Sequence, residues 1–536
     1  MLKPAKRKSL RGRMALGMKS LGQQVAAGFE RTALALGGFA SATGGYESGR
    51  RARSGRRTRG WLPGEGSAAA DILPDLPTLR GRARDLDRNH ALAHGALGTR
   101  ATGIVGTGLR LRSVIDFKVL GITDQAVIED LQYTIEREWE IFEREADFSA
   151  LQHLRDAQRM WLWSADVSGD IGIARRWRKR PGDTYGTKLV AIEADRISNP
   201  NRATDSDTLQ AGVVLSTAGE VLGYHVSDRH PGELRGRALN WAYVPRTGPS
   251  GRMQFILAAR ITRPGQVRGV PLFAPVEDVL KQLGDYTAAE IKAAINDAFL
   301  FAFEETPSEV DEDGLPIITR PDGETDEAGE LTLDDLAITS LPPGSKVNVK
   351  KPERPNTAFD GFVTALCKHL GAALGLPYEV LMMHFGASFS ASRGALEVAW
   401  KGFLVEQAWF IRTILDPVRE WQFTEMVASG RFEAPGFFDD PIVRQAWLGC
   451  EWIGPTRIQI NPQVEAKADE TDINMKVKTR EQVMTERTGG DFDTKAKRIL
   501  HEESVLGGSA PAGAASARNI ERNNDGTDQT EEGDEE

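Results

Sequence analysis

Histidines and serines occur in two places with a spacing that could support chemistry, but neither place completes a site. His90 and His94 lie one helical turn apart, as metal ligands can, yet no His-Glu-x-x-His pattern and no evident third ligand accompany them. Ser388, Ser390 and Ser392 flank an arginine, but no Gly-x-Ser-x-Gly elbow is present, and a helix start is the simpler account of these hydroxyls. Structural roles therefore explain both sets best.

Phosphate-binding and cysteine-based chemistry is equally incomplete. The sequence has no Gly-x-x-x-x-Gly-Lys-Ser/Thr, which argues against a P-loop ATPase, and the glycines of 103–108 are in the wrong order for a dinucleotide fingerprint. The acidic stretch 304–335 matches no calcium-binding loop. Only two cysteines occur, Cys367 and Cys450, which excludes a disulfide framework or a Cys-rich metal site. We expect no enzyme activity, no cofactor and no metal.

Two clusters of basic side chains are better suited to binding than to catalysis. The first surrounds Trp177 and consists of Arg175, Arg176, Arg178, Lys179 and Arg180. It could dock on an acidic partner surface, or it could be a solvated turn. The second consists of Lys346, Lys350, Lys351 and Arg354, and Pro352 and Pro355 should stiffen this segment and keep it out of a sheet. Either cluster could contact an anionic surface.

Charge is distributed unevenly along the chain, whose net charge is −9. Residues 1–60 hold 14 Lys or Arg against two acidic residues, 304–335 hold 13 Asp or Glu and one Arg, and 501–536 hold 10 Asp or Glu against two Arg. Blocks of like charge at chain ends commonly act as solvated interaction arms. We therefore expect a basic flexible arm over 1–77, which could bind DNA or an acidic protein in a salt-dependent way, and an acidic disordered tail over 501–536. Plain solubilising ends are the alternative.

The elements that must position these residues alternate between helical and strand periodicity. The 536 residues are 40% apolar and 27% charged, as in soluble globular chains, and no stretch reads as a membrane span. Helical spacing recurs over 78–94, 124–142, 148–163, 275–303, 359–374 and 393–428, where Pro417 should kink the last helix. Short β-type runs occupy 188–192, 213–216, 221–226 and 255–259, and another strand is expected near Val347 and Val349. The pattern predicts an α+β subunit with a β-rich insertion between helices.

Several ordered stretches together resemble the lambda-type portal proteins of tailed bacteriophages. The most specific is Arg263-Pro-Gly-Gln-Val-Arg-Gly-Val-Pro-Leu272. The others are Arg82–His90 running on to Gly103–Leu111, Ile192–Ile197 with Gly223–Val226, Gly371–Glu379 with Ser390–Arg393, and Trp452–Arg457 with Asn461–Ala466. Coverage runs from about 78 to 505. The chain departs from the family at Asn461-Pro-Gln-Val-Glu465, where Asp-Pro-x-Lys-Glu is usual, which puts any role of that acid and lysine in doubt.

The resemblance implies a structural, ring-forming virion protein with no enzyme activity. Such a ring, typically of twelve subunits, sits at a single capsid vertex and conducts double-stranded DNA during genome packaging and ejection. Its partners would be terminase, which is the separate motor, a head-tail connector or adaptor protein, the major capsid protein and the scaffold. Assembly would take place in the host cytoplasm, and no membrane would be involved.

The resemblance also maps the parts of a portal subunit onto this chain. The wing would take 78–147 and 304–375, the stem helices 148–164 and 270–303, the β-rich clip 165–268, and the crown and C-terminal helical region 376–500. The loop 344–357 would project into the bore, so that Lys346, Lys350, Lys351 and Arg354 would contact DNA. The cluster at 175–180 would dock partners at the clip. Trp409, off the main apolar stripe of 393–428, is expected at a subunit interface, although it could instead belong to the core of its own subunit.

Two functions of other classes stay open at this point. A DNA-processing enzyme could use the basic arm as a clamp, but it would need an acid cluster or a nucleophile that does not stand out. A DNA-binding adaptor or capsid-lining protein could use its arms without conducting DNA.

Overall fold

The computed structural model of the chain describes residues 65–233, 238–299, 359–386, 388–457, 462–488 and 492–506. All elements below belong to the part that runs from Ser67 onward. The acidic loop 304–335, the loop 344–357 and the strand expected near Val347 and Val349 lie outside the described residues. Helices α2 (Ala68–Ile72) and α3 (Leu76–Asn89) begin within the stretch expected to be a flexible arm, and α16 (Phe492–Leu506) extends into the expected acidic tail.

The first predicted helix is two helices, because the backbone breaks at His90. His90 is extended, with φ −118° and ψ 108°, between α3 and α4 (Ala91–Ile104). Its ring nitrogen accepts a hydrogen bond from the Ala93 amide and so caps α4. The glycine-dense stretch after α4 leads into β1 (Arg110–Ser113), as expected, and β1 pairs antiparallel with β9 (Cys450–Ile453).

Two longer helices follow the short α5 (Phe117–Leu120). In α6 (Gln125–Glu145), Asp124 is the N-cap and the apolar stripe is buried, which confirms the periodicity. The next helix, expected from 148, begins later, as α7 (Leu154–Ser168). Leu151, assigned to its apolar side, is 87% exposed, because the Asp147 carboxylate accepts hydrogen bonds from the amides of Leu151 and Gln152 and holds 147–152 as a turn.

The β-rich region folds into two antiparallel sheets. The first has the order β3-β2-β8 and consists of β2 (Asp170–Trp177), β3 (Thr187–Glu193) and β8 (Phe255–Ala259). The second has the order β4-β5-β6-β7 and consists of β4 (Leu209–Gln210), β5 (Val213–Leu215), β6 (Val221–Ser227) and β7 (Trp241–Pro245). The four predicted runs are strands β3, β5, β6 and β8, whereas β2, β4 and β7 were not predicted.

The first sheet is covered on both faces. Ile173 and Ile256 on one face belong to the main core with the helices, whereas Phe255 on the other face packs with Tyr224 and Val226 of the second sheet. Short 3-10 turns at Ala194–Arg196 and Pro200–Arg202 connect the two sheets. The first sheet therefore lies between the helical core and the second sheet.

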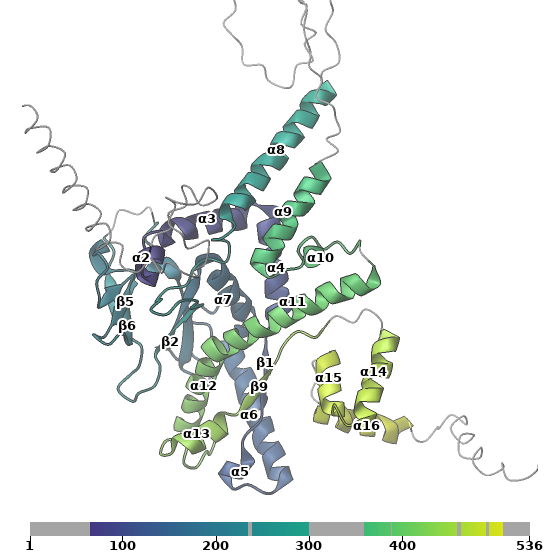
Figure 1. Cartoon of the computed structure of the whole chain (residues 1–536). Coiled ribbons are helices and arrows are strands. Elements are labelled where there is room, and N and C mark those ends of the chain that lie inside the picture. Colours follow the sequence, from purple (N-terminus) through teal and green to yellow (C-terminus); the bar gives the residue numbers. More distant parts are fainter. Residues whose placement is uncertain are drawn as a thin grey trace, which may run out of the picture. The chain divides into compact units, whose positions relative to one another are not determined.

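Two helices flank the undescribed segment 300–358. Helix α8 (Glu277–Phe299) begins two residues after the start of the helical spacing at 275 and packs on α9 (Phe359–Leu374), as Figure 1 shows. The contact includes Tyr286, whose ring stacks on Phe359 with centroids 5.6 Å apart and meets Phe362 edge-on. Tertiary packing thus continues along α8 beyond its buried first turns.

The longest predicted helix is α11 (Phe389–Phe410), a π-helical turn (η4, Ile411–Leu415) and α12 (Asp416–Ala428), which run on from one another in Figure 1. Since Pro417 has no amide hydrogen to donate, the irregular turn falls where the kink was predicted. Short α10 (Tyr378–Leu381) precedes α11, and α13 (Pro441–Leu448), α14 (Pro462–Asn474) and α15 (Arg480–Thr488) complete the described elements with α16. Among the residues described, no helix is long and apolar enough to span a bilayer.

Candidate functional site

The four cations expected in the bore loop, Lys346, Lys350, Lys351 and Arg354, lie outside the described residues. The other predicted site residues are described, and they belong to β2 with its following turn and to α11. The structure also contains buried charge networks that the sequence analysis did not identify.

The predicted cationic cluster occupies the outer end of β2 and the turn toward β3. Arg176, Trp177, Arg178 and Lys179 are exposed, and Trp177 keeps 67% of its surface accessible. The indole rests on Gly186, where a Cβ would come within 2.6 Å of it. A flat aromatic side chain with cations on both sides of it in sequence is therefore presented to solvent.

Contacts beneath this surface anchor the turn. Arg180 donates hydrogen bonds to the backbone carbonyls of Asp147 and Phe148, so its charge is used within the subunit. On α12, Glu425 accepts hydrogen bonds from the amides of Gly186 and Thr187 at 2.7 and 2.8 Å. Only part of the cluster, Arg176, Arg178 and Lys179, is thus available to a partner.

Trp409 lies on α11 and is half-buried at the edge of the main core. The guanidinium of Arg260 lies 4.2 Å from the centroid of its ring, a cation–π contact within the subunit. Arg260 also pairs with Asp166 and Glu406, both at 2.7 Å, and Arg100 pairs with the same two carboxylates. This network joins α4, α7, α11 and the segment after β8.

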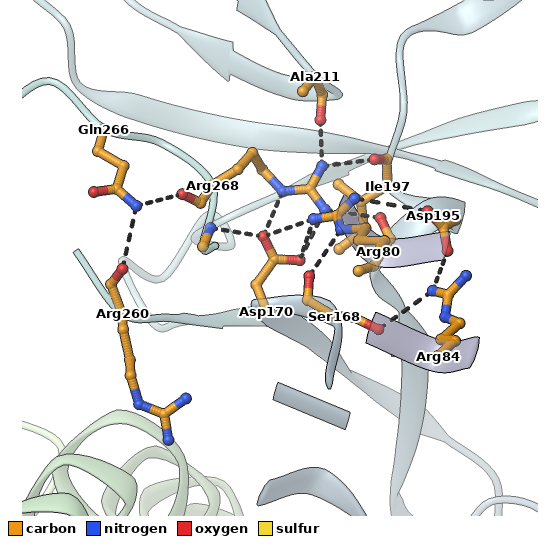
Figure 2. A network of polar contacts seen from close by, with 12 residues as sticks. Arg80, Arg84, Ser168, Asp170, Asp195, Ile197, Ala211, Arg260, Gln266 and Arg268 are labelled. Atoms are coloured by element: carbon orange, nitrogen blue, oxygen red, sulfur yellow. Dashed lines mark hydrogen bonds and ion pairs between the residues drawn. The ribbon is translucent and has the colours of Figure 1, made fainter. Parts of the chain in front are cut away.

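A second buried network centres on Arg268, which is 1% exposed and comes from the most specific stretch of the sequence, 263–272. Its guanidinium donates to both oxygens of Asp170, at 2.7 and 2.8 Å. It also donates to the backbone carbonyls of Ala194, Ile197 and Ala211, as Figure 2 shows. One side chain thereby ties the loop after β8 to β2, to the connection between β3 and β4, and to the turn between β4 and β5.

Helix α3 enters the same network through two arginines (Figure 2). Arg80 donates to Asp170 at 3.2 Å and to the Ser168 carbonyl at 2.8 Å, and Arg84 pairs with Asp195. Burial alone would raise the pKa of Asp170, but the charges of Arg268 and Arg80 outweigh it and leave the pKa below its ordinary value. Asp170 is therefore a buried carboxylate that stays ionised between two guanidinium groups.

Two buried ionisable groups lack such compensation. Neither carboxylate oxygen of Glu277, at the start of α8, has a hydrogen-bond partner, and Arg82 is its ion-pair neighbour at 3.9 Å. Burial raises the pKa of Glu277 to about 7. Arg419 on α12 donates to Gln422, but its Nε and one terminal nitrogen are unsatisfied, and burial lowers its pKa to about 10.

The arrangement can hold elements together and present charge, but it assembles no reactive constellation in the described residues. No group of three or more His, Cys, Asp or Glu side chains there could hold a metal ion. His94 hydrogen-bonds to Asp87. Ser388 caps α11 by accepting from the Ala391 amide, which confirms the helix start predicted at the serines. The buried networks could have been suspected from the charged residues within otherwise apolar stretches, such as Asp166 near the end of α7 and Asp170 at the start of β2.

Comparison with known proteins finds one family over most of the chain. A family model described as phage portal protein, lambda family, matches residues 54–407. The portal protein of Escherichia phage N15 is 26% identical over 495 residues, which are 86% of this chain and 91% of that protein. Portal protein B of Escherichia phage lambda is 26% identical over 496 residues with the same coverage.

Similar solved structures come from gene transfer agent (GTA) particles. The neck of the native particle, computed with C12 symmetry, contains a chain that is 12% identical with a TM-score of 0.42, covering 77% of this chain and 92% of that chain. A chain in the virion of the native particle is 13% identical with a TM-score of 0.35 and the same coverage.

Proposed function

Because the chain belongs to the lambda family of phage portal proteins, we propose that its copies form a ring at one capsid vertex through which double-stranded DNA enters and leaves. As a portal protein it is a structural component of the virion. The observation that carries the proposal is the family match over residues 54–407, together with two portal proteins aligned over 86% of the chain. We propose a ring of twelve and a role without catalysis.

Charge supports a conduit that does not grip its cargo. Each copy has a net charge of −9, so a ring of copies carries a net negative charge that opposes tight binding of the phosphate backbone. Contact with DNA then falls to a few cations, and the bore loop with Lys346, Lys350, Lys351 and Arg354 supplies them in this proposal. Weak phosphate contacts without base readout let a duplex slide.

The assignment of parts to the ring is also a proposal. The two sheets within 165–268 would form the clip, and 78–147 with 304–375 the wing. The stem helices would lie within 148–164 and 270–303. Helix α8 belongs to the second of these ranges and packs on α9, so α9 would be part of the stem as well. The crown would take 376–500. Terminase and a head-tail connector would dock on Arg176, Arg178 and Lys179, and the capsid protein and scaffold would surround the ring during assembly in the host cytoplasm.

Negative-stain electron microscopy of the purified chain tests the proposal directly. Rings with a central hole are the expected result, and image classes give the number of copies. A chain that stays a compact monomer at micromolar concentration and in the presence of scaffold would overturn the ring, and with it the conduit. A ring with a closed centre would instead favour a capsid-lining protein.

A further inference from the structure

A groove of about 840 Å³ runs beside β8, between the second sheet and the π-helical turn that precedes α12. Four of the five residues of β8 line it, and the exposed Ile261 extends the lining beyond the strand. One wall comes from β5, β6 and the turn between them, and the other from Arg412, Thr413 and Pro417. The groove therefore follows a strand rather than enclosing a compact pocket.

The strand at the base of this groove is at the edge of its sheet. In the order β3-β2-β8, β8 pairs with β2 alone, from Phe255 opposite Ala174 to Ala259 opposite Asp170. Successive residues of a strand direct their backbone N–H and C=O groups to alternate sides. The side of β8 away from β2 thus carries donors and acceptors that no strand of the described residues pairs with.

Both layers of the fold shield this edge, which is how natural edge strands commonly avoid uncontrolled pairing. Ile256 and Ala258 face the main core, whereas Phe255 and Leu257 face the second sheet. An added strand would be covered on its two faces by the groove walls. Its length is limited by the hairpin bond from the Gln254 amide to the Arg246 carbonyl at one end and the Gly265–Val267 turn at the other.

The charged residues that line the groove indicate what kind of peptide could bind in it. Arg246 and Arg412 line the groove, and in the described part of the chain neither has a carboxylate within ion-pair distance. The acidic residue of the lining is Asp207, so the groove has an excess of positive charge. An extended segment with Asp or Glu between apolar residues would complement both the charge and the apolar base formed by Phe255 and Leu257.

We propose that this groove binds an acidic, extended peptide segment of a partner protein, which adds to the first sheet as a fourth strand beside β8. The main chain of the peptide supplies the hydrogen bonds and its side chains fill the walls, as in β-strand addition elsewhere. The inference does not depend on ring formation, because all of its parts belong to one subunit.

The probe is the synthetic peptide acetyl-Thr-Val-Glu-Val-Asp-Val-Thr-amide, labelled with fluorescein and titrated with the full-length chain. Two versions carry N-methyl groups on alternate residues, one on the odd and one on the even positions. Strand addition requires one version to bind at least about tenfold more weakly while the other is tolerated, because only one set of amides faces β8. A version with Lys in place of Glu and Asp should also bind at least about tenfold more weakly.

On the protein, Arg246→Glu with Arg412→Glu should weaken binding of the acidic peptide and strengthen binding of the lysine peptide. Arg88→Glu with Arg202→Glu, both exposed and outside the groove lining, is the matched control and should leave both affinities unchanged. Circular dichroism checks that each variant is folded, and hydrogen exchange should show new protection at Phe255–Ala259 on binding.

Three results would overturn the proposal. Equal binding of both N-methylated peptides would exclude strand addition, and no binding up to about 1 mM would exclude a peptide site of useful affinity. Self-association that the groove double variant abolishes would identify a second copy as the occupant instead. Ring formation, followed by microscopy on the same samples, reports on the proposed portal role separately.

Discussion

Arg268 illustrates how one side chain can fix the junction of several elements. Its guanidinium satisfies Asp170 and three backbone carbonyls at once, which requires the planar, multiple-donor shape of arginine. We predict that Arg268→Met lowers the free energy of unfolding by about 3 kcal/mol or more, because it leaves buried acceptors without donors. Arg268→Lys should recover little of this loss, since lysine cannot reach all of these acceptors in one geometry.

Urea unfolding followed by tryptophan fluorescence measures the effect. The matched control is Arg263→Met in the same loop, where the arginine is 46% exposed and its partner Asp71 is 41% exposed. An exposed pair of this kind contributes about 0–1 kcal/mol. Equal midpoints for the two methionine variants would contradict a structural role for the Arg268 network.

The raised pKa of Glu277 leads to a prediction about how the stability of the chain depends on pH. Its pKa is raised to about 7 in the folded chain by burial, with Arg82 opposing the shift and Asp278 adding to it. The folded state then holds a proton that the unfolded state releases, so the contribution to stability is full at low pH and is lost as pH rises toward 7. We predict that Glu277→Gln is about 1–2 kcal/mol more stable than the natural chain at pH 8 and equal to it near pH 4, after allowance for screening by solvent and Arg82.

Urea midpoints of both proteins across this pH range give the difference directly, with other titrating groups cancelling. Asp130→Asn, which removes an exposed carboxylate on α6 that has no part in the Glu277 shift, is the control and should show no such trend. A Gln variant that is less stable than the natural chain at pH 8 would mean that the fold favours the ionised carboxylate, which would contradict the raised pKa.

At the scale of elements, the turn between β2 and β3 presents the cations proposed to dock partners. Arg176 and Lys179 are exposed, whereas Arg180 is bonded to the backbone beneath. We predict that Arg176→Glu with Lys179→Glu lowers DNA packaging several-fold while rings form normally, because the anchors of the turn are untouched. Packaging assays with purified rings measure this, and Arg202→Glu, exposed on another turn, serves as the control. Packaging at the natural level in the double variant would remove the docking role.

Helix α11 has a second apolar face that the described part of its own subunit leaves uncovered. Val398 and Val405, on the same side as Gly402 and Trp409 at spacings of three and four, are 64% and 69% exposed. If this face packs against a neighbouring copy, Val405→Glu should reduce the yield of rings at least about fivefold and leave the monomer folded. Trp409→Glu should act likewise, although it also removes the contact with Arg260.

Size-exclusion chromatography with microscopy gives the ring yield, and circular dichroism gives the fold. Leu404→Glu is the matched control, since Leu404 adjoins Val405 in sequence but points about 100° away around the helix. Equal loss of rings in both variants would indicate general damage to α11 rather than an interface.

Local patterns predicted most of the elements because strong periodicity survives tertiary packing. The stripe of α6 from Ile128 to Phe142, the break before Pro417 and four strands were read correctly. Strand β2 was missed because its outer half is polar, although its inner half is buried on both faces. The division of the first helix at His90 was missed because it depends on a side-chain cap, which the spacing of apolar residues does not reveal. The edge position of β8 depends on strand order, which no local pattern encodes.

At the scale of the whole molecule, the charge networks join segments that lie far apart in the sequence. Arg80, Asp170 and Arg268 span 188 positions of sequence, and Arg100 pairs with Glu406, which lies 306 positions away. The sequence analysis identified 263–272 as the most specific stretch of the resemblance, but it did not indicate which residues Arg268 pairs with. Ion pairs between residues so far apart in sequence can be assigned only once the fold is known.

The proposed conduit depends on cations repeated around that ring. Lys346, Lys350, Lys351 and Arg354 bring four positive charges to a short segment of a chain with a net charge of −9. If they line the bore, each ring has a collar of phosphate contacts that are individually weak and blind to sequence. Replacing all four with alanine should leave rings intact but reduce packaging or retention of the genome several-fold, with a flatter dependence on salt.

The control for this variant keeps the number of removed charges but takes them from the basic N-terminal arm, at Arg50, Arg51, Arg53 and Arg56. Both variants are compared in packaging and in DNA retention at low and high salt. The dependence of DNA binding on salt concentration reports the number of counterions that the protein displaces from DNA. If the four cations line the bore, their removal changes the salt dependence of translocation. If the arm lies outside the bore, removal of its arginines changes the salt dependence of binding only. Normal packaging and retention of full-length DNA by the fourfold alanine ring would require withdrawing the loop from the bore, while the family membership of the chain would stand.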